Sequence, residues 1–167
     1  MRRPVLVAGL SLAVIAGGAR ASLRQLSFDP ANAETKSAAG GVTFLIEQGM
    51  FGQKVLKMRA TEAKATADLR PANHDAPAAP GWTLYAIVEK DDGPALVAAL
   101  CPGSRHGWIA LGRVAYGADL QAVVIGDSPG GGTHRCRTLD FIFHGEWRLP
   151  AGAAPTIYGE GPPDFPN

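Results

Sequence analysis

The sequence of 167 residues has little net charge and few aromatic side chains. Its 16 lysines and arginines nearly balance 15 aspartates and glutamates, which leaves a formal net charge of +1, and aromatic residues make up only 7% of the chain. A nucleic-acid-binding domain usually carries a basic patch or stripe, whereas the basic residues here are interleaved with acidic ones. We therefore expect no nucleic-acid partner.

Beyond its N-terminus the chain lacks a hydrophobic run of the roughly 20 residues that a transmembrane helix needs. Residues 1–21 combine Arg2 and Arg3 with an apolar stretch over residues 4–18 and the small-x-small sequence Ala19-Arg20-Ala21. That order is typical of a secretory signal peptide, which is removed on export. We therefore expect a periplasmic or secreted protein with no membrane span after cleavage. The abundance of alanine, glycine and arginine points to a bacterial source.

A sustained helical period is also lacking, and short alternating segments separated by turn residues stand in its place. Residues Trp82, Leu84, Ala86 and Val88, for example, alternate with more polar neighbours up to the turn at Asp92-Gly93. We expect successive hairpins formed by residues 42–48 with 54–61, 82–88 with 95–100, 108–116 with 120–125, and 135–143 with 146–149. The sequence thus predicts a mainly β fold, a single antiparallel β-sandwich or small barrel built from successive hairpins after the N-terminal signal peptide.

The flanking segments divide the rest of the chain. Residues 22–41 mix small and polar residues and end in two glycines, which favours an extended lead-in to a β-rich domain over residues 42–149. Residues 62–69 suit either a short helix or an edge strand, with a slight preference for the strand. Residues 150–167 form a Pro/Gly-rich C-terminal tail.

Only two cysteines are present, Cys101 and Cys136. In an exported protein a disulfide between them is the expected state, and closing this loop stabilises the fold by roughly 3 to 4 kcal/mol. The alternative is a zinc site in which His106 and His134 join the two thiolates. The cysteines lack the short spacing that is usual in such sites, so we favour the disulfide and expect neither a metal nor another cofactor.

The loop from Gly126 to Gly131 carries the candidate nucleophile Ser128. Its sequence GDSPGG resembles the nucleophile loop of chymotrypsin-like serine proteases, which implies a Ser128 hydroxyl activated by His106 or His134. The sequence departs from that pattern at Pro129, directly after the serine. A turn rich in Gly, Asp, Ser and Pro more often has this composition for backbone reasons, so the loop favours a turn over a catalytic site.

The three tryptophans are candidates for a ligand platform, because indole faces stack well on sugars and apolar ligands. In a chain with so few aromatics they serve more simply as core residues. We expect a non-enzymatic module that binds a ligand or an envelope component, with a small exported hydrolase or a metal-binding protein as alternatives. The candidate ligand-binding residues are Trp82, Trp108 and Trp147.

Overall fold

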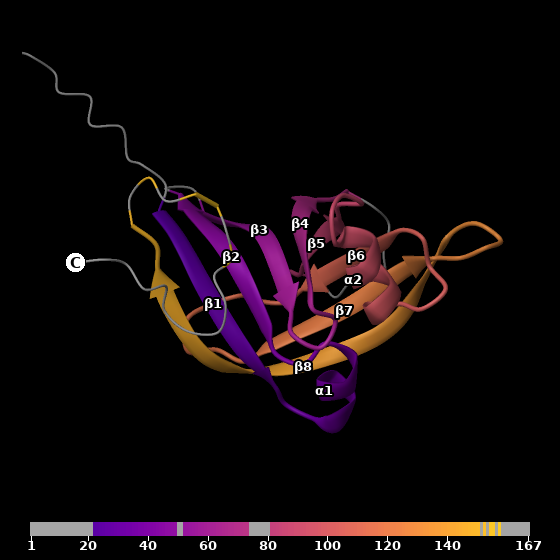
Figure 1. Ribbon diagram of the computed structural model, residues 1–167, viewed down its shortest axis with the longest axis horizontal. Helices are drawn as coiled ribbons and strands as arrows, with labels where there is room; N and C mark the ends of the chain where they lie inside the picture. The colour runs from indigo at the N-terminus through magenta and orange to yellow at the C-terminus, as the bar shows by residue number, and fades with distance from the viewer. Residues whose placement is uncertain are drawn as a thin grey trace, which may run out of the picture.

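The computed structural model describes residues 22–49, 52–73, 81–150, 152, 154, 155 and 157. They form a closed antiparallel barrel in which each strand pairs with its neighbours along the sequence and the last strand pairs with the first (Figure 1). The prediction of a mainly β fold is confirmed, as the small barrel rather than the sandwich. The strands are β1 (Ser22–Pro30), β2 (Val42–Gly49), β3 (Gly52–Ala60), β4 (Ala65–Pro71), β5 (Thr83–Ile87), β6 (Gly107–Leu111), β7 (Leu120–Asp127) and β8 (Thr133–Arg148).

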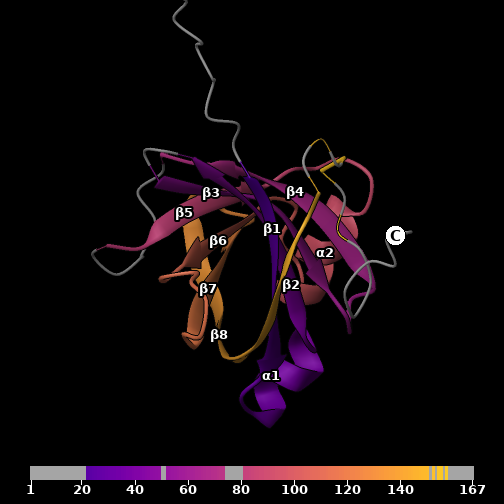
Figure 2. The ribbon, with the colours of Figure 1, turned by 90° about the vertical axis from the view of Figure 1, so that its left-hand side faces the viewer.

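Two short helices interrupt the strand order. Helix α1 (Ala33–Ala38) connects β1 to β2, and helix α2 (Gly93–Leu100) connects β5 to β6. The two helices lie apart, with α1 at the bottom of the molecule in both views (Figure 1, Figure 2). No helix within the described residues has the length and apolar character that would let it span a membrane.

The expectation that residues 22–41 are only a lead-in is wrong, because the barrel begins at Ser22. Strand β1 pairs with β2 on one side and with β8 on the other, and so closes the barrel. Leu26 and Phe28 point inwards and are almost fully buried. β1 pairs with β8, more than 100 residues away, as extensively as with its neighbour β2, and local composition carries no signal for the pairing with β8.

The expected strand at residues 95–100 is instead helix α2. Pro94 occupies the first turn of this helix, where its missing N–H is tolerated. The buried side chains of Leu96, Val97 and Leu100 follow the spacing of a helical face and join the barrel core. Gly93 is required at the helix start, because a Cβ there would lie 1.9 Å from the carbonyl oxygen of Val88.

The expected hairpin around His144-Gly145 is also wrong, because β8 runs through both residues as one strand of 16 residues. Its first part pairs with β7, up to Phe141, and its second part pairs with β1. Ser27 lies opposite Gly145 and Phe28 opposite Phe143, so His144 is the extra residue of a β-bulge. A bulge bends a strand, and this one lies within the part of β8 that pairs with β1.

The remaining strand expectations agree with the structure more closely. The hairpins at residues 42–61 and 108–125 are β2–β3 and β6–β7, although β6 already ends at Leu111. Of residues 62–69, the part from Ala65 onwards belongs to strand β4, with Ala65, Ala67 and Leu69 facing the core. The predicted signal peptide at residues 1–21 and most of the predicted tail at residues 150–167 lie outside the described residues.

Strand β5 places Leu84 and Ala86, two residues of the alternating set, on the outside of the barrel. Tyr85 and Ile87 face the barrel core, whereas Leu84 packs in a separate outer cluster with Ala110, Val123 and Ile125. Trp82 and Trp108 cover this outer cluster. Both faces of β5 are therefore apolar, so its alternation did not define which face turns inwards.

Candidate functional site

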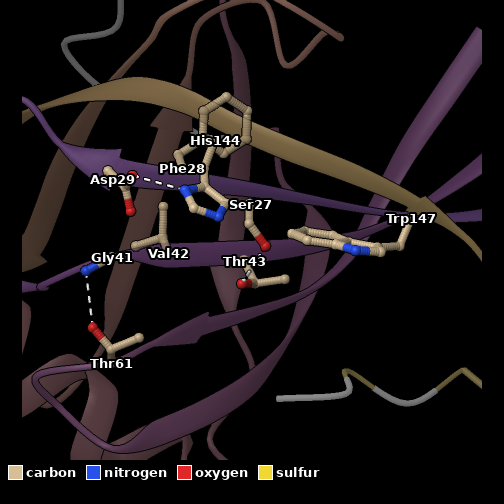
Figure 3. A pocket seen from close by; sticks show the side chains of 9 residues that line it. All are labelled: Ser27, Phe28, Asp29, Gly41, Val42, Thr43, Thr61, His144 and Trp147. Carbon is tan, nitrogen blue, oxygen red and sulfur yellow. Dashed lines mark hydrogen bonds and ion pairs between the residues drawn. The ribbon is translucent and has the colours of Figure 1, made fainter. Parts of the chain in front are cut away.

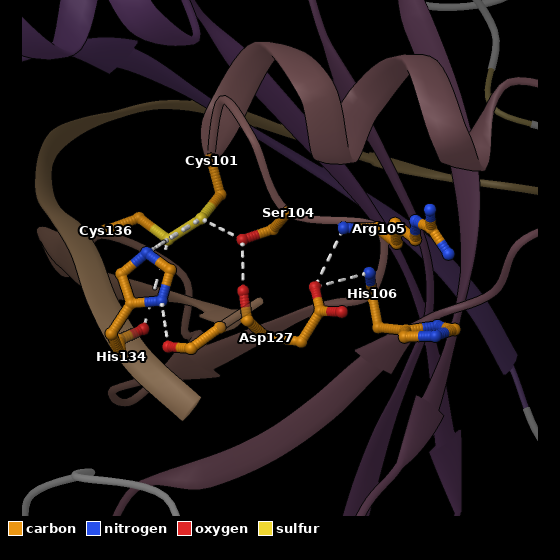
Figure 4. Close-up of a disulfide and its surroundings, with 8 residues drawn as sticks. Cys101, Ser104, Arg105, His106, Asp127, His134 and Cys136 are labelled. Carbon is orange, nitrogen blue, oxygen red and sulfur yellow. Dashed lines mark hydrogen bonds between the residues drawn. A yellow bond between two sulfur atoms is a disulfide. The ribbon is translucent and has the colours of Figure 1, made fainter. Parts of the chain in front are cut away.

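A disulfide between Cys101 and Cys136 links the end of α2 to β8 (Figure 4). The two Cα atoms are 5.3 Å apart. Cys101 is fully buried, whereas Cys136 is only half-buried. The predicted disulfide is therefore confirmed in the structure.

His134 lies between this disulfide and Ser128. Its Nε2 atom is 3.9 Å from Cys101 Sγ and 3.7 Å from Cys136 Sγ, and its Nδ1 atom is 3.1 Å from Ser128 Oγ (Figure 4). On the far side of Cys101, Ser104 Oγ approaches the sulfur to 3.1 Å and donates a hydrogen bond to the Asp127 carbonyl at 3.0 Å. The β7–β8 connection and the start of β8 supply Ser128 and His134, and the segment that follows α2 supplies Cys101 and Ser104.

His106 is not part of the cluster. Its side chain pairs with Glu89, and this hydrogen bond is the main cause that raises the pKa of His106. The backbone N–H groups of His106 and Arg105 both donate to Asp127 Oδ1 at 2.8 Å. These donors lower the pKa of Asp127. The structure thus separates His106 from the other three residues of the expected zinc set.

Ser128 and His134 form a pair of the kind that activates a nucleophile, but the third group of a triad faces elsewhere. The second imidazole nitrogen of His134 points at sulfur, a poor acceptor, and the Asp127 carboxylate is held by the backbone of residues 105 and 106. A catalytic serine–histidine pair usually needs a carboxylate or similar group to orient the imidazole. The geometry therefore gives a Ser128–His134 pair without a carboxylate that orients the imidazole.

The three tryptophans do not share one surface. Trp82 and Trp108 pack on the outer cluster, where they act as core residues, while Trp147 lines a shallow pocket of about 130 Å³ on the outside of β1 and β2 (Figure 3). In that pocket the polar groups are paired with one another. His144 Nδ1 and Asp29 Oδ2 are 2.8 Å apart, and the hydroxyls of Ser27 and Thr43 are 2.9 Å apart.

A larger cavity lies at the barrel mouth where β3 and β5 begin and β6 ends. Its volume is about 330 Å³, and we call it the mouth cavity. Its wall combines buried apolar side chains with polar groups near the rim. The lining residues are Gln53, Val55, Gly81, Thr83, Tyr85, Leu111, Gly112, Arg113 and Val114.

Tyr85 supplies the one buried hydroxyl of this wall. Its ring is 4% exposed, and its oxygen accepts a hydrogen bond from the backbone N–H of Val55 at 3.4 Å. Burial raises the pKa of Tyr85, so the phenol stays protonated at neutral pH. Tyr85 thus lines the mouth cavity as a neutral phenol whose oxygen is held by the backbone of β3.

The segment after β6 forms one side of the mouth. Gln53 donates a hydrogen bond from its side-chain amide to the carbonyl of Val114, and the Val114 side chain is buried. This contact ties the segment to the start of β3. Arg113 is exposed at the rim, and no described carboxylate pairs with it.

An adjoining pocket of about 180 Å³ shares Gln53 with the mouth cavity. Its charged residues are already paired, because Arg24 and Glu146 form an ion pair at 3.1 Å. Arg113 is therefore the unpaired positive charge among the described residues that line the two pockets. Sequence patterns did not reveal the mouth cavity, because its residues come from strands far apart in the chain.

A comparison with models of known protein families, with curated proteins and with solved structures finds no match to this chain.

Proposed function

We propose that the protein is an exported, non-enzymatic module that binds a small ligand in the mouth cavity of its barrel. The observation that carries the proposal is the cavity itself. Barrel mouths are frequent ligand sites, and the cavity's volume of about 330 Å³ lies at the lower end of the range for small-molecule pockets.

The wall indicates the chemistry of the ligand. Val55, Leu111 and Val114 line the cavity but are almost fully buried, so they offer a small apolar surface that fits a small apolar group of the ligand. Tyr85 offers a hydrogen-bond donor inside the cavity, and Arg113 offers a positive charge at its rim. A small amphipathic molecule with an anionic or hydrogen-bond-accepting end satisfies all three features.

Export is the second part of this proposal. It rests on the sequence of residues 1–21, and the disulfide supports it because such bonds persist in oxidising compartments. The ligand is then a molecule of the periplasm or cell exterior, or a part of an envelope component that presents a small apolar group with an acidic end.

Fluorescence of anilinonaphthalene sulfonate, a small amphipathic anion, tests the proposal. We expect saturable binding of one probe molecule per chain. Thr83→Trp, which fills the cavity from its exposed rim, should abolish this binding, and Arg113→Gln should weaken it about tenfold, the usual scale for losing one charge-assisted contact.

Two control variants make the same chemical changes away from the cavity. Thr133→Trp adds an indole at the start of β8, and Arg105→Gln removes an exposed arginine near the disulfide. Both should bind the probe as the wild type does. Equal binding by Thr83→Trp and the wild type would contradict the proposed site.

A hydrolase is the second candidate, because Ser128 Oγ lies 3.1 Å from His134 Nδ1. It predicts covalent labelling by a fluorophosphonate probe and loss of that labelling in Ser128→Ala. Ser37→Ala, which changes an exposed serine of α1, is the matched control. Absence of labelling in the folded wild type counts against this candidate and leaves the binding proposal unaffected.

A further inference from the structure

We propose that reduction of the Cys101–Cys136 disulfide opens a zinc site whose ligands are the two thiolates and His134 Nε2. The ligand atoms of these three residues all lie within 4.8 Å of one another. The site lies at the disulfide and is independent of ligand binding in the mouth cavity.

The position of His134 already fits a zinc ion. Tetrahedral zinc with Zn–S distances of about 2.3 Å and Zn–N distances of about 2.0 to 2.1 Å places nitrogen and sulfur roughly 3.6 Å apart. His134 Nε2 lies 3.7 Å and 3.9 Å from the two sulfurs. The main change required is a separation of the two sulfurs, from bonded contact to roughly 3.8 Å, by rotation of the cysteine side chains.

Neighbouring hydroxyls prepare the ligands for this role. In the tautomer that carries its proton on Nδ1, His134 donates to Ser128 Oγ, and the lone pair of Nε2 then faces the sulfurs. A metal-binding histidine almost always has such a partner on its other nitrogen. Ser104 Oγ lies 3.1 Å from Cys101 Sγ, and its one proton, which bonds the Asp127 carbonyl in the oxidised protein, can turn to that sulfur once it is a thiolate.

The fourth zinc position would face solvent. His134 is exposed and Cys136 is half-buried, so water can reach the ion from their side, while Cys101 anchors it to the buried end of α2. Two thiolates, one imidazole and one water form a known type of open zinc site.

Reduction of the disulfide requires a dithiol as the reductant. This dithiol is either a small molecule or the active site of a thiol–disulfide oxidoreductase. The dithiol gives two electrons to the Cys101–Cys136 bond and becomes a disulfide itself, and its two protons pass to the cysteine sulfurs. Zinc then binds both sulfurs and releases those two protons to solvent. The oxidised protein has no thiolate to offer, so the site is closed until such a donor acts.

Cobalt and zinc titrations test this inference. The protein is reduced with dithiothreitol, desalted without oxygen and titrated with Co²⁺, whose thiolate charge-transfer and visible bands report tetrahedral sulfur ligation. We expect one Co²⁺ per reduced chain, displacement by Zn²⁺, and no such bands in the oxidised protein.

Substitutions separate this site from adventitious binding to free thiols. His134→Ala should weaken binding by more than tenfold, and Ser128→Ala by about tenfold, the usual lower limit for loss of an outer-shell partner. His106→Ala is the matched control and should bind as the wild type does, because His106 faces Glu89.

Three results of the metal titrations would overturn the inference. They are tetrahedral bands in the oxidised protein, equal affinity of His134→Ala and the wild type, and weaker binding by His106→Ala than by His134→Ala. Far-ultraviolet circular dichroism accompanies each titration. A reduced protein that loses its β signal and does not regain it with Zn²⁺ also contradicts a metal site built on the folded barrel.

Discussion

Replacing both Cys101 and Cys136 by alanine removes the covalent link between the end of α2 and strand β8. In the folded protein this link closes a loop that contains all of β6 and β7. Without it, the unfolded chain gains conformational freedom, while the hydrogen-bonded ladders of β6, β7 and β8 still hold the same residues in the native state. We therefore expect a less stable protein with the same fold.

The sequence separation of the two cysteines sets the magnitude. For a separation of 35 residues, the chain-entropy relation gives about 4 kcal/mol at 25 °C. A domain of this size has a free energy of unfolding of roughly 5 to 15 kcal/mol, so the variant should remain folded with a reduced margin. Its melting temperature should fall by about 8 to 16 °C, at 2 to 4 °C for each kcal/mol.

Urea unfolding followed by circular dichroism measures this change. Reduced wild-type protein is the control, because it loses the same bond and keeps the sulfur atoms that fill the buried site of Cys101. The two proteins should show similar losses. A loss of less than about 1 kcal/mol in the free energy of unfolding would refute the view that the disulfide acts mainly on the unfolded chain. A double variant that is unfolded in buffer without urea would show that the barrel core cannot hold the fold without the disulfide.

Three further predictions concern α2, His106 and α1. Gly93→Ala should lower the free energy of unfolding in urea by about 1 to 3 kcal/mol, because its Cβ would lie 1.9 Å from the Val88 carbonyl oxygen, whereas Gly130→Ala, with no atom within 4 Å, should be close to neutral. His106 should titrate in NMR spectra with a pKa above its ordinary value. Its pairing with Glu89 therefore stabilises the fold fully below about pH 6.5, and this stabilisation is lost as the pH rises through the raised pKa. Glu89→Gln should return the pKa of His106 towards normal, and an unchanged pKa in this variant would contradict the pairing. Asn32→Ala should lower the free energy of unfolding by about 1 kcal/mol in the same urea assay, because Asn32 Oδ1 caps α1 by accepting a hydrogen bond from the backbone N–H of Thr35 at 2.8 Å. Asn32→Ser should retain most of this stability, and equal losses in both variants would count against the cap.

The sequence predicted best those strands that have one wet face. Residues 54–61 alternate clearly, and they form β3 beside β2 as expected. The same reasoning failed at residues 95–100, because a short continuous apolar run has the same pattern in a buried strand and in a buried helix. The pattern of β5 misled in a different way, since the outer cluster under Trp82 and Trp108 makes both of its faces apolar.

Long-range pairing explains the other errors in the fold. Strand β1 pairs with β8 as well as with β2, and no local pattern near Ser22 can indicate the pairing with β8. His144-Gly145 has the composition of a turn, yet the opposite strand makes it a bulge. There the ring of Trp147 lies over Gly145, where a Cβ would come within 3.2 Å of the indole.

The same difference between local and long-range contacts decides which candidate site the sequence could predict. The contact of Cys136 with Cys101 could be predicted because the chain has only two cysteines. His134 and Ser128 lie close to Cys136 in the sequence, so they come near the disulfide with it. The mouth cavity could not be predicted, because Gln53, Tyr85 and Val114 are brought together only by closure of the barrel. A tyrosine within an apolar segment also gives no sign that its hydroxyl opens into a cavity.

Amide NMR spectra recorded during titration with anilinonaphthalene sulfonate test the central claim most directly. If the mouth cavity is the binding site, saturable shifts should occur at Val55, Tyr85 and Leu111, while amides around the disulfide stay unchanged. Shifts that gather instead around Trp147 or around Cys136, or an absence of saturable shifts, would contradict the claim.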